Sequence, residues 1–159
     1  MPETAVKDQE SALARRGVGL HERGFVQVPG ETVGYELRSI DTRSDQQRES
    51  DAQRGAPDGN IMVVIPGHGQ TVHGPKKLAA AAALLSKSKM AWCIDLVPAR
   101  RGDLAEAEAI AQVVRDRISK AFPTRAGTAA ATLIGWSHGG SEALRAAEQD
   151  PELFPQVLG

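Results

Sequence analysis

The stretch "LIGWSHGGSEALR", Leu133–Arg145, joins an apolar run, a Gly-x-Ser-x-Gly pattern and a segment with helical spacing. Gly135, Ser137 and Gly139 form the pattern. A serine on a sharp turn between a buried strand and a helix can act as a nucleophile, and flanking glycines permit the strained backbone of such a turn. The helix that follows directs N–H groups toward developing negative charge. The stretch therefore predicts a parallel α/β fold with Ser137 as candidate nucleophile.

The chain around this stretch alternates between short apolar runs and amphipathic segments. "IMVVI" from Ile61, "MAWCIDL" from Met90 and "AAATLIGW" from Ala129 are typical of strands buried on both faces of a parallel sheet. "FPQVLG", at the end of the chain, has the composition of another strand. Helices are expected from Pro75, with Leu78, Ala82 and Leu85 on one face; from Asp103 to about Ala121, with Leu104, Ala107, Ala111, Val114 and Ile118 buried; and from His138 to about Gln149.

The first third of the chain is organised differently. "GFVQVPGETVGYEL" alternates apolar and polar residues around Pro29-Gly30 and predicts a β-hairpin. Residues 1–22 are polar and are expected to be a disordered leader, which makes 23–159 the domain. Residues 41–60 are densely charged, so we expect a mobile, exposed loop there. The expected fold is a mostly parallel α/β sheet with an antiparallel N-terminal hairpin and helices on both faces.

Composition excludes several classes of function. Nineteen basic residues nearly balance twenty acidic ones, and no basic stripe with aromatic residues is present, which argues against a nucleic-acid partner. No apolar run approaches the ~20 residues of a membrane span, and the N-terminus has no apolar segment typical of a secretory signal. The single cysteine, Cys93, lies in an apolar run and is interpreted as a buried residue of a cytoplasmic protein.

These motifs resemble those of the α/β-hydrolase family over residues 24–159. "IMVVIPGHGQT" is similar to the family's third strand and oxyanion loop, with Gly67 and Gly69 as the loop glycines and the N–H of His68 as one oxyanion donor. "GWSHGG" is similar to the nucleophile elbow, which implies Ser137 as nucleophile and the N–H of His138 as the second donor. The family's first loop histidine is replaced here by Pro66. The resemblance also implies a structural role for Asp95, after the fourth strand.

The catalytic triad is incomplete in this sequence. In the family the acid and the histidine follow the serine, on loops after later strands. The four histidines are His21, His68, His73 and His138, and none lies far enough beyond Ser137. The acidic residues after the serine, Glu142, Glu148, Asp150 and Glu152, fall on or just past the expected helix. We therefore expect that a C-terminal part carrying both groups is missing from the 159-residue chain.

Alternative interpretations exist for each motif. Ser137 is also compatible with a small residue at a tight turn, and Gly67 with Gly69 is compatible with an ordinary strand-to-helix turn. His68 and His73 lack Asp, Glu or Cys partners, so a solvated pair is favoured over a metal site. Trp136 fits either substrate contact or core packing. The spacing of "GHGQTVHG" does not match a dinucleotide-binding loop.

Two hypotheses for function follow. The first is a serine hydrolase that acts on a small-molecule carboxylic ester or thioester, without cofactor or metal. The second is a non-catalytic module that keeps the hydrolase half-fold and binds a ligand or a partner. The codons after Gly159 distinguish them, because an open frame with a loop Asp and a later His favours the enzyme. The substrate and the oligomeric state are not readable from the sequence.

Overall fold

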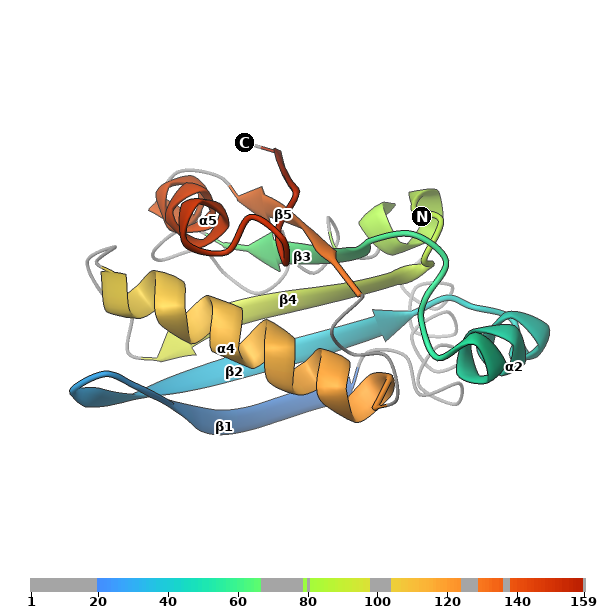
Figure 1. Ribbon diagram of the computed structural model, residues 1–159, viewed down its shortest axis with the longest axis horizontal. Coiled ribbons are helices and arrows are strands. Elements are labelled where there is room, and N and C mark those ends of the chain that lie inside the picture. The colour runs from blue at the N-terminus through green and yellow to red at the C-terminus, as the bar shows by residue number, and fades with distance from the viewer. Residues whose placement is uncertain are drawn as a thin grey trace, which may run out of the picture.

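A six-stranded mixed sheet forms the centre of the computed structural model, which describes residues 20–66, 79, 81–97, 104–123, 129–135 and 138–158 (Figure 1). For 20, 97, 104–105 and 138–142 only the backbone is described. The strands are β1 (Leu20–Val28), β2 (Glu31–Asp41), β3 (Ile61–Ile65), β4 (Met90–Val97), β5 (Ala131–Gly135) and β6 (Gln156–Leu158), and the helices are α2 (Asp45–Arg54), α4 (Leu104–Ala121) and α5 (His138–Gln149).

The strand order is β1-β2-β4-β3-β5-β6. β1 and β2 form the predicted antiparallel hairpin, with Gly30 in its two-residue turn at φ 83°, a conformation that favours glycine. β2 is antiparallel to β4, whereas β3 is parallel to both β4 and β5, and β5 is parallel to β6. The predicted mixed α/β sheet is therefore confirmed. The hairpin begins at Leu20, so the expected leader of residues 1–22 overlaps the strand by three residues.

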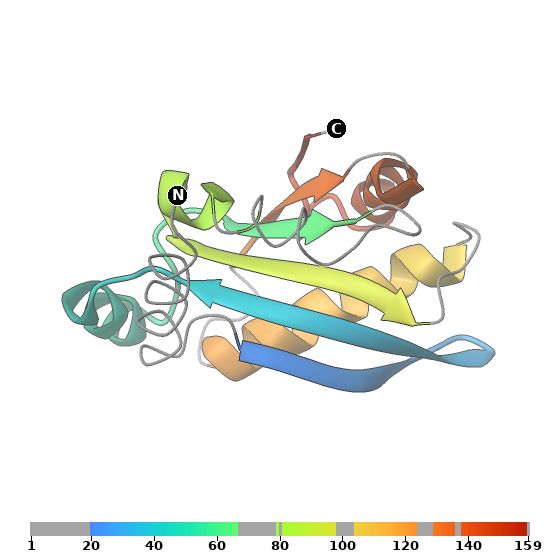
Figure 2. The same ribbon diagram turned by 180° about the vertical axis from the view of Figure 1, so that it is seen from behind.

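Side chains alternate between the two faces of the sheet, as strand geometry requires. On one face, Val63 and Leu133 lie beneath α4 and α5 in the larger core cluster. On the other face, Val64 and Cys93 pack with the helical residues Ala79 and Ala83. Figure 2 shows this second face, with α4 crossing behind β2 and β4. Helices therefore pack on both faces, as predicted.

The helix that contains residues 81–85 packs on the sheet with only part of the predicted face, because Ala82 is buried as predicted but Leu85 is not. Leu85 is 87% exposed, whereas Ala79, Ala82 and Ala83 are buried. Small side chains let the helix backbone approach the sheet closely, so alanines replace leucine in the contact. Leu78, the other predicted contact residue, lies outside the described residues. By contrast, the predicted buried face of α4 is confirmed at Ala107, Ala111, Val114 and Ile118.

The prediction of a loop over residues 41–60 is wrong at Asp45–Arg54, because α2 forms there. Ser44 caps the helix by accepting a hydrogen bond from the N–H of Gln47, and Gly55 ends it at φ 77°. The fully buried carboxylate of Asp51 accepts hydrogen bonds from Arg43 and Arg54 at 3.0 and 2.6 Å. Charged hydrogen bonds thus order a segment that has almost no apolar surface. The expected mobility of this segment stays a prediction.

Arg43 joins α2 to the end of β2. Its guanidinium also donates to Asp41 from Nε and Nη2, at 3.0 and 2.8 Å. Burial raises the pKa of Asp41, but the hydrogen bonds from Arg43 outweigh it and hold that pKa below its ordinary value. The two carboxylates therefore share one guanidinium, which couples the position of the helix to the strand.

Asp51→Asn is expected to destabilise α2 locally. The substitution removes the charge that both arginines contact, at a cost of about 2 kcal/mol, so the amides of α2 should exchange roughly 30-fold faster. Hydrogen exchange resolved by residue measures this. Glu49→Gln, an exposed change on the same helix, is the matched control. Equal exchange in Asp51→Asn and wild type would contradict the assigned role.

Gly24→Ala is expected to destabilise the hairpin. A Cβ at Gly24 would lie 2.7 Å from Oη and 2.9 Å from Cζ of Tyr35, its cross-strand partner, so the ring would have to move. Overpacking of this kind costs about 1–3 kcal/mol. Urea denaturation measures the loss. In a double-mutant cycle, Tyr35→Ala should relieve most of it, and additive losses would exclude the steric explanation.

Candidate active site at the carboxyl ends of β3 and β5

The carboxyl ends of two neighbouring parallel strands define the candidate site. Ile65, the last residue of β3, pairs with Gly135, the last residue of β5. The segment that begins with Pro66 therefore leaves the sheet beside the segment that begins with Trp136. These two segments carry the predicted oxyanion loop and the predicted nucleophile. The register thus brings together two motifs that are about 70 residues apart in the sequence.

The connection from β5 to α5 has two residues. β5 ends at Gly135 and α5 begins at His138, as predicted, so only Trp136 and Ser137 lie between them. The first turn of α5 contains no acidic residue, whereas α2 and α4 have Asp45 and Glu106 at the same place. The partial positive charge of this helix end is therefore not offset by a carboxylate of its own first turn.

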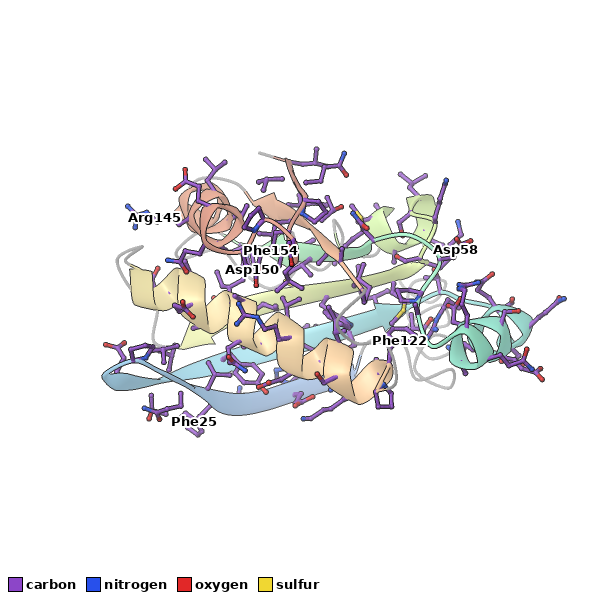
Figure 3. The ribbon with its side chains drawn as sticks, viewed as in Figure 1. Phe25, Asp58, Phe122, Arg145, Asp150 and Phe154 are labelled. Carbon is purple, nitrogen blue, oxygen red and sulfur yellow. The ribbon has the colours of Figure 1, made fainter. Side chains whose placement is uncertain are left out.

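Packing on α4 and on the sheet holds α5 in position. Ala143 and Ala146 are fully buried in the larger core cluster. Asp150, just after the helix, accepts a hydrogen bond from Arg115 of α4 at 2.7 Å and one from the N–H of Leu153 at 3.2 Å. Figure 3 shows Asp150 between the two helices and Phe154 on the inner side of α5. The N-terminus of α5 is thereby fixed relative to β5.

The predicted site residues are only partly among those that the structure describes. Gly135 is the last residue of β5, and His138 and Gly139 are the first two residues of α5. Their backbone lies at the candidate site. Four predicted residues lie outside the described part of the chain: Ser137, Gly67, His68 and Gly69. Trp136 and His73 lie outside it as well.

His21, Glu148 and Asp150 lie away from this end of the sheet. His21 is on β1, four strands from β5, which corresponds to ~19 Å at the usual strand spacing. Its Nε2 is 3.6 Å from Glu36 on the neighbouring strand. Glu148 is exposed near the far end of α5, and Asp150 is paired with Arg115. The expectation that the acid of the triad lies on a later loop stays a prediction.

Cys93 is buried in β4, as predicted. Burial raises the pKa of its thiol to about 12, and the nearby charge of Asp95 acts in the same direction. A thiol with this pKa is protonated at neutral pH and is a poor nucleophile. Asp95 is exposed and lies within β4 rather than after it, on the same face as Ala91 and Cys93 of the smaller core cluster.

Two general properties of the described residues bear on the candidate chemistry. No three His, Cys, Asp or Glu side chains among them are grouped to hold a metal ion. No helix in that part of the chain combines the length and apolar character that a membrane span needs. The first turn of α5, which has no carboxylate, is a feature of the site that the sequence analysis did not name, although "HGGS" shows it.

Solved structures with the same arrangement are hydrolases. The chain has a TM-score of 0.52 and 20% identity to an esterase from Pyrobaculum calidifontis, over 96% of its own length and 50% of the esterase. For the peroxisomal alpha-beta-hydrolase Lpx1 from Saccharomyces cerevisiae the TM-score is 0.52 with 15% identity, over 87% and 42% of the two chains. The chain has an α/β-hydrolase fold.

A thermostable esterase has this hydrolase fold too, with a TM-score of 0.55 at 12% identity over 86% of the chain and 40% of the esterase. The chain therefore spans half or less of the length of these hydrolases. No protein-family model matches the sequence. No curated protein matches it either. At these identities the comparison establishes the hydrolase fold, and the chemistry is argued from the candidate site.

Proposed function

We propose that the protein is a serine hydrolase that cleaves a small-molecule carboxylic ester or thioester, with Ser137 as nucleophile. One observation carries the proposal: the pairing of Ile65 with Gly135 places the starts of both candidate motifs side by side. Ser137 follows the strand end by two residues and directly precedes α5. A serine between a central parallel strand and a helix is the setting that nucleophilic attack requires in this fold.

The oxyanion would be held by two backbone N–H groups, those of His68 and His138. His68 is three residues beyond Ile65, and His138 is the first residue of α5. Three extended residues span at most ~10 Å, so both groups are within reach of the same point above the strand ends. Donors fixed in this way act on charge that appears only during the reaction, and each typically contributes 10²–10³-fold, as a rough guide, to the rate.

The proposed reaction has two stages. Oγ of Ser137 attacks the carbonyl carbon, the N–H groups of His68 and His138 stabilise the tetrahedral oxyanion, and its collapse expels the alcohol or thiol. Water then attacks the acyl-serine ester, releases the carboxylic acid and restores the hydroxyl of Ser137. Both stages need a histidine to take and return the proton, and an acid to orient it. We propose that both groups lie beyond Gly159, after the pattern of the fold.

The proposed reaction requires neither a cofactor nor a metal, and it does not involve a nucleic acid. We propose a small-molecule substrate because solved structures that share this fold include esterases. The single cysteine, buried and unpaired, fits a location in the cytoplasm. The acyl and leaving groups of the substrate would be selected by loops outside the described residues.

A fluorophosphonate probe tests the proposed nucleophile. A chain extended to the natural stop codon should react once, at Ser137, and peptide mass spectrometry should identify the modified residue. Ser137→Ala should abolish the reaction, while Ser141→Ala, a serine four residues away in α5, should leave it unchanged. An extended chain that does not react, or reacts equally after Ser137→Ala, would exclude the proposal and favour the non-catalytic module.

A further inference from the structure

Among the described residues, no strand pairs with the outer edge of β1. β1 is at one end of the strand order and pairs only with β2 among the residues that the structure describes. It is nine residues long. An edge strand directs the N–H and C=O groups of alternate residues away from its neighbour, and these groups can pair with another strand. This edge is therefore able to accept a further strand.

The two faces of β1 differ in exposure: the apolar side chains on one face are buried beneath α4, and the side chains on the other face are exposed. Val26 and Val28 are buried in the larger core cluster, whereas Phe25 is 78% exposed. Figure 3 shows Phe25 projecting outward at the margin of the sheet. Beside it is a groove of about 270 Å³, and the residues that line the groove are Arg23, Gly24, Phe25, Gly34, Tyr35 and Glu36. Burial of an exposed aromatic ring against a partner is favourable, so Phe25 and the groove together form a candidate contact surface.

Arg23 lies on the same face as Phe25, two residues away. Its Nη2 is 2.9 Å from Glu36, its cross-strand partner on β2. The carboxylate holds the guanidinium of Arg23 over the β1–β2 pair, and the Arg23 side chain stays 74% exposed, so it remains accessible to a group added beside β1. Less side-chain entropy is therefore lost when Arg23 meets an additional group at that edge.

We propose that β1 pairs antiparallel with β1 of a second copy of this chain, about a two-fold axis at Gly24. In that register Arg23 lies opposite the partner subunit's Phe25, and Phe25 lies opposite the partner subunit's Arg23. Each guanidinium then meets an aromatic ring, and symmetry forms the contact twice.

Neighbouring registers are less favourable. An axis at Arg23 sets two guanidinium groups against each other, and like charges directly opposite destabilise a strand pair. An axis at Phe25 pairs Arg23 with the partner subunit's Gln27 and loses both cation–aromatic contacts. Of these three registers, only the one centred on Gly24 places each Arg23 opposite a Phe25. One strand pair buries less area than stable dimers need, so the assembly is weak and depends on protein concentration.

Sedimentation velocity over a dilution series tests the surface. The wild-type chain should shift from monomer to dimer as its concentration rises, and Phe25→Ala should weaken dimerisation roughly 30-fold because both symmetric contacts are lost. Leu144→Ala and Leu158→Ala remove exposed apolar side chains from α5 and β6 and should change nothing. A protein that stays monomeric, or a dimer sensitive to Leu158→Ala and not to Phe25→Ala, would overturn the proposal.

Cysteine cross-linking tests the register. Arg23→Cys and Phe25→Cys chains, mixed under mild oxidation, should form a disulfide-linked heterodimer, because residues 23 and 25 face each other across the axis. Each variant alone should not cross-link, and neither should Arg23→Cys mixed with Gln27→Cys. The mixed dimer retains one native Arg23–Phe25 contact, and the native Cys93 is buried. Preferential linking in the 23–27 mixture would show that the strands pair in another register.

Discussion

Ser137→Ala should lower ester hydrolysis about 10⁴-fold or more in a chain extended to the natural stop codon. The loss is large because the substitution removes the attacking atom, and the remaining oxyanion donors accelerate only the attack of water. Release of p-nitrophenol from short-chain p-nitrophenyl esters measures it. Ser141→Ala should retain wild-type activity, because that residue lies within α5 rather than at the strand end.

The 159-residue chain alone should respond quite differently to the same substitution. Without a histidine to accept its proton, the hydroxyl of Ser137 is a poor nucleophile, so Ser137→Ala should change the slow background rate less than about tenfold. If the short chain instead reacts stoichiometrically with a fluorophosphonate at Ser137, a base is present within it. His73 would then be the first residue to replace, since it follows the candidate oxyanion segment in the sequence.

Phe154→Ala should cause the largest loss of stability, about 3–5 kcal/mol. Phe154 is 2% exposed and packs in the larger core cluster between α5 and β6. Its N–H donates to the carbonyl of Asp150, so the backbone cannot easily move to fill the cavity. Urea denaturation should show the reduced free energy of unfolding, and the midpoint of thermal unfolding should fall by ~10 °C.

Phe25→Ala is the matched control for this experiment. The same atoms are removed from a ring that is 78% exposed, so stability should change by less than ~0.5 kcal/mol. The measurement is made at a concentration where the chain is monomeric. Similar losses for the two variants would mean that Phe154 is not a core residue, and the packing of α5 on the sheet would need to be revised.

The sequence predicted the parallel part of the fold well because its signals are local. Each apolar run of β3, β4 and β5 needs burial on both faces, and Pro29-Gly30 fixes the hairpin turn. The inference that a segment without apolar side chains forms a loop failed for α2, because arginines and not apolar neighbours hold Asp51 in place. It also failed at Leu85, because nothing in a run of alanines and leucines indicates that the alanines make the contact.

The sequence predicted both motifs of the candidate site but not that they lie side by side. The spacing of "PGHG" and "GWSHGG" predicts strand ends and a helix start, and the structure confirms the bounds at Ile65, Gly135 and His138. Their adjacency depends on which strands pair, and that is decided by long-range packing that no local pattern encodes. The positions of the side chains of Ser137 and His68 remain predictions.

The order β4-β3-β5 has a consequence for how substrates would approach. From β3 the chain continues toward β4 through the helix at 81–85 on one face, whereas from β5 it continues toward β6 through α5 on the opposite face. β3 and β5 therefore form a topological switch point, where successive connections turn away from each other; in open α/β sheets this is where ligands bind. A change in the connection after β3 or in the connection after β5 would then alter specificity from one side of the site. The other connection and the strand ends would stay unchanged.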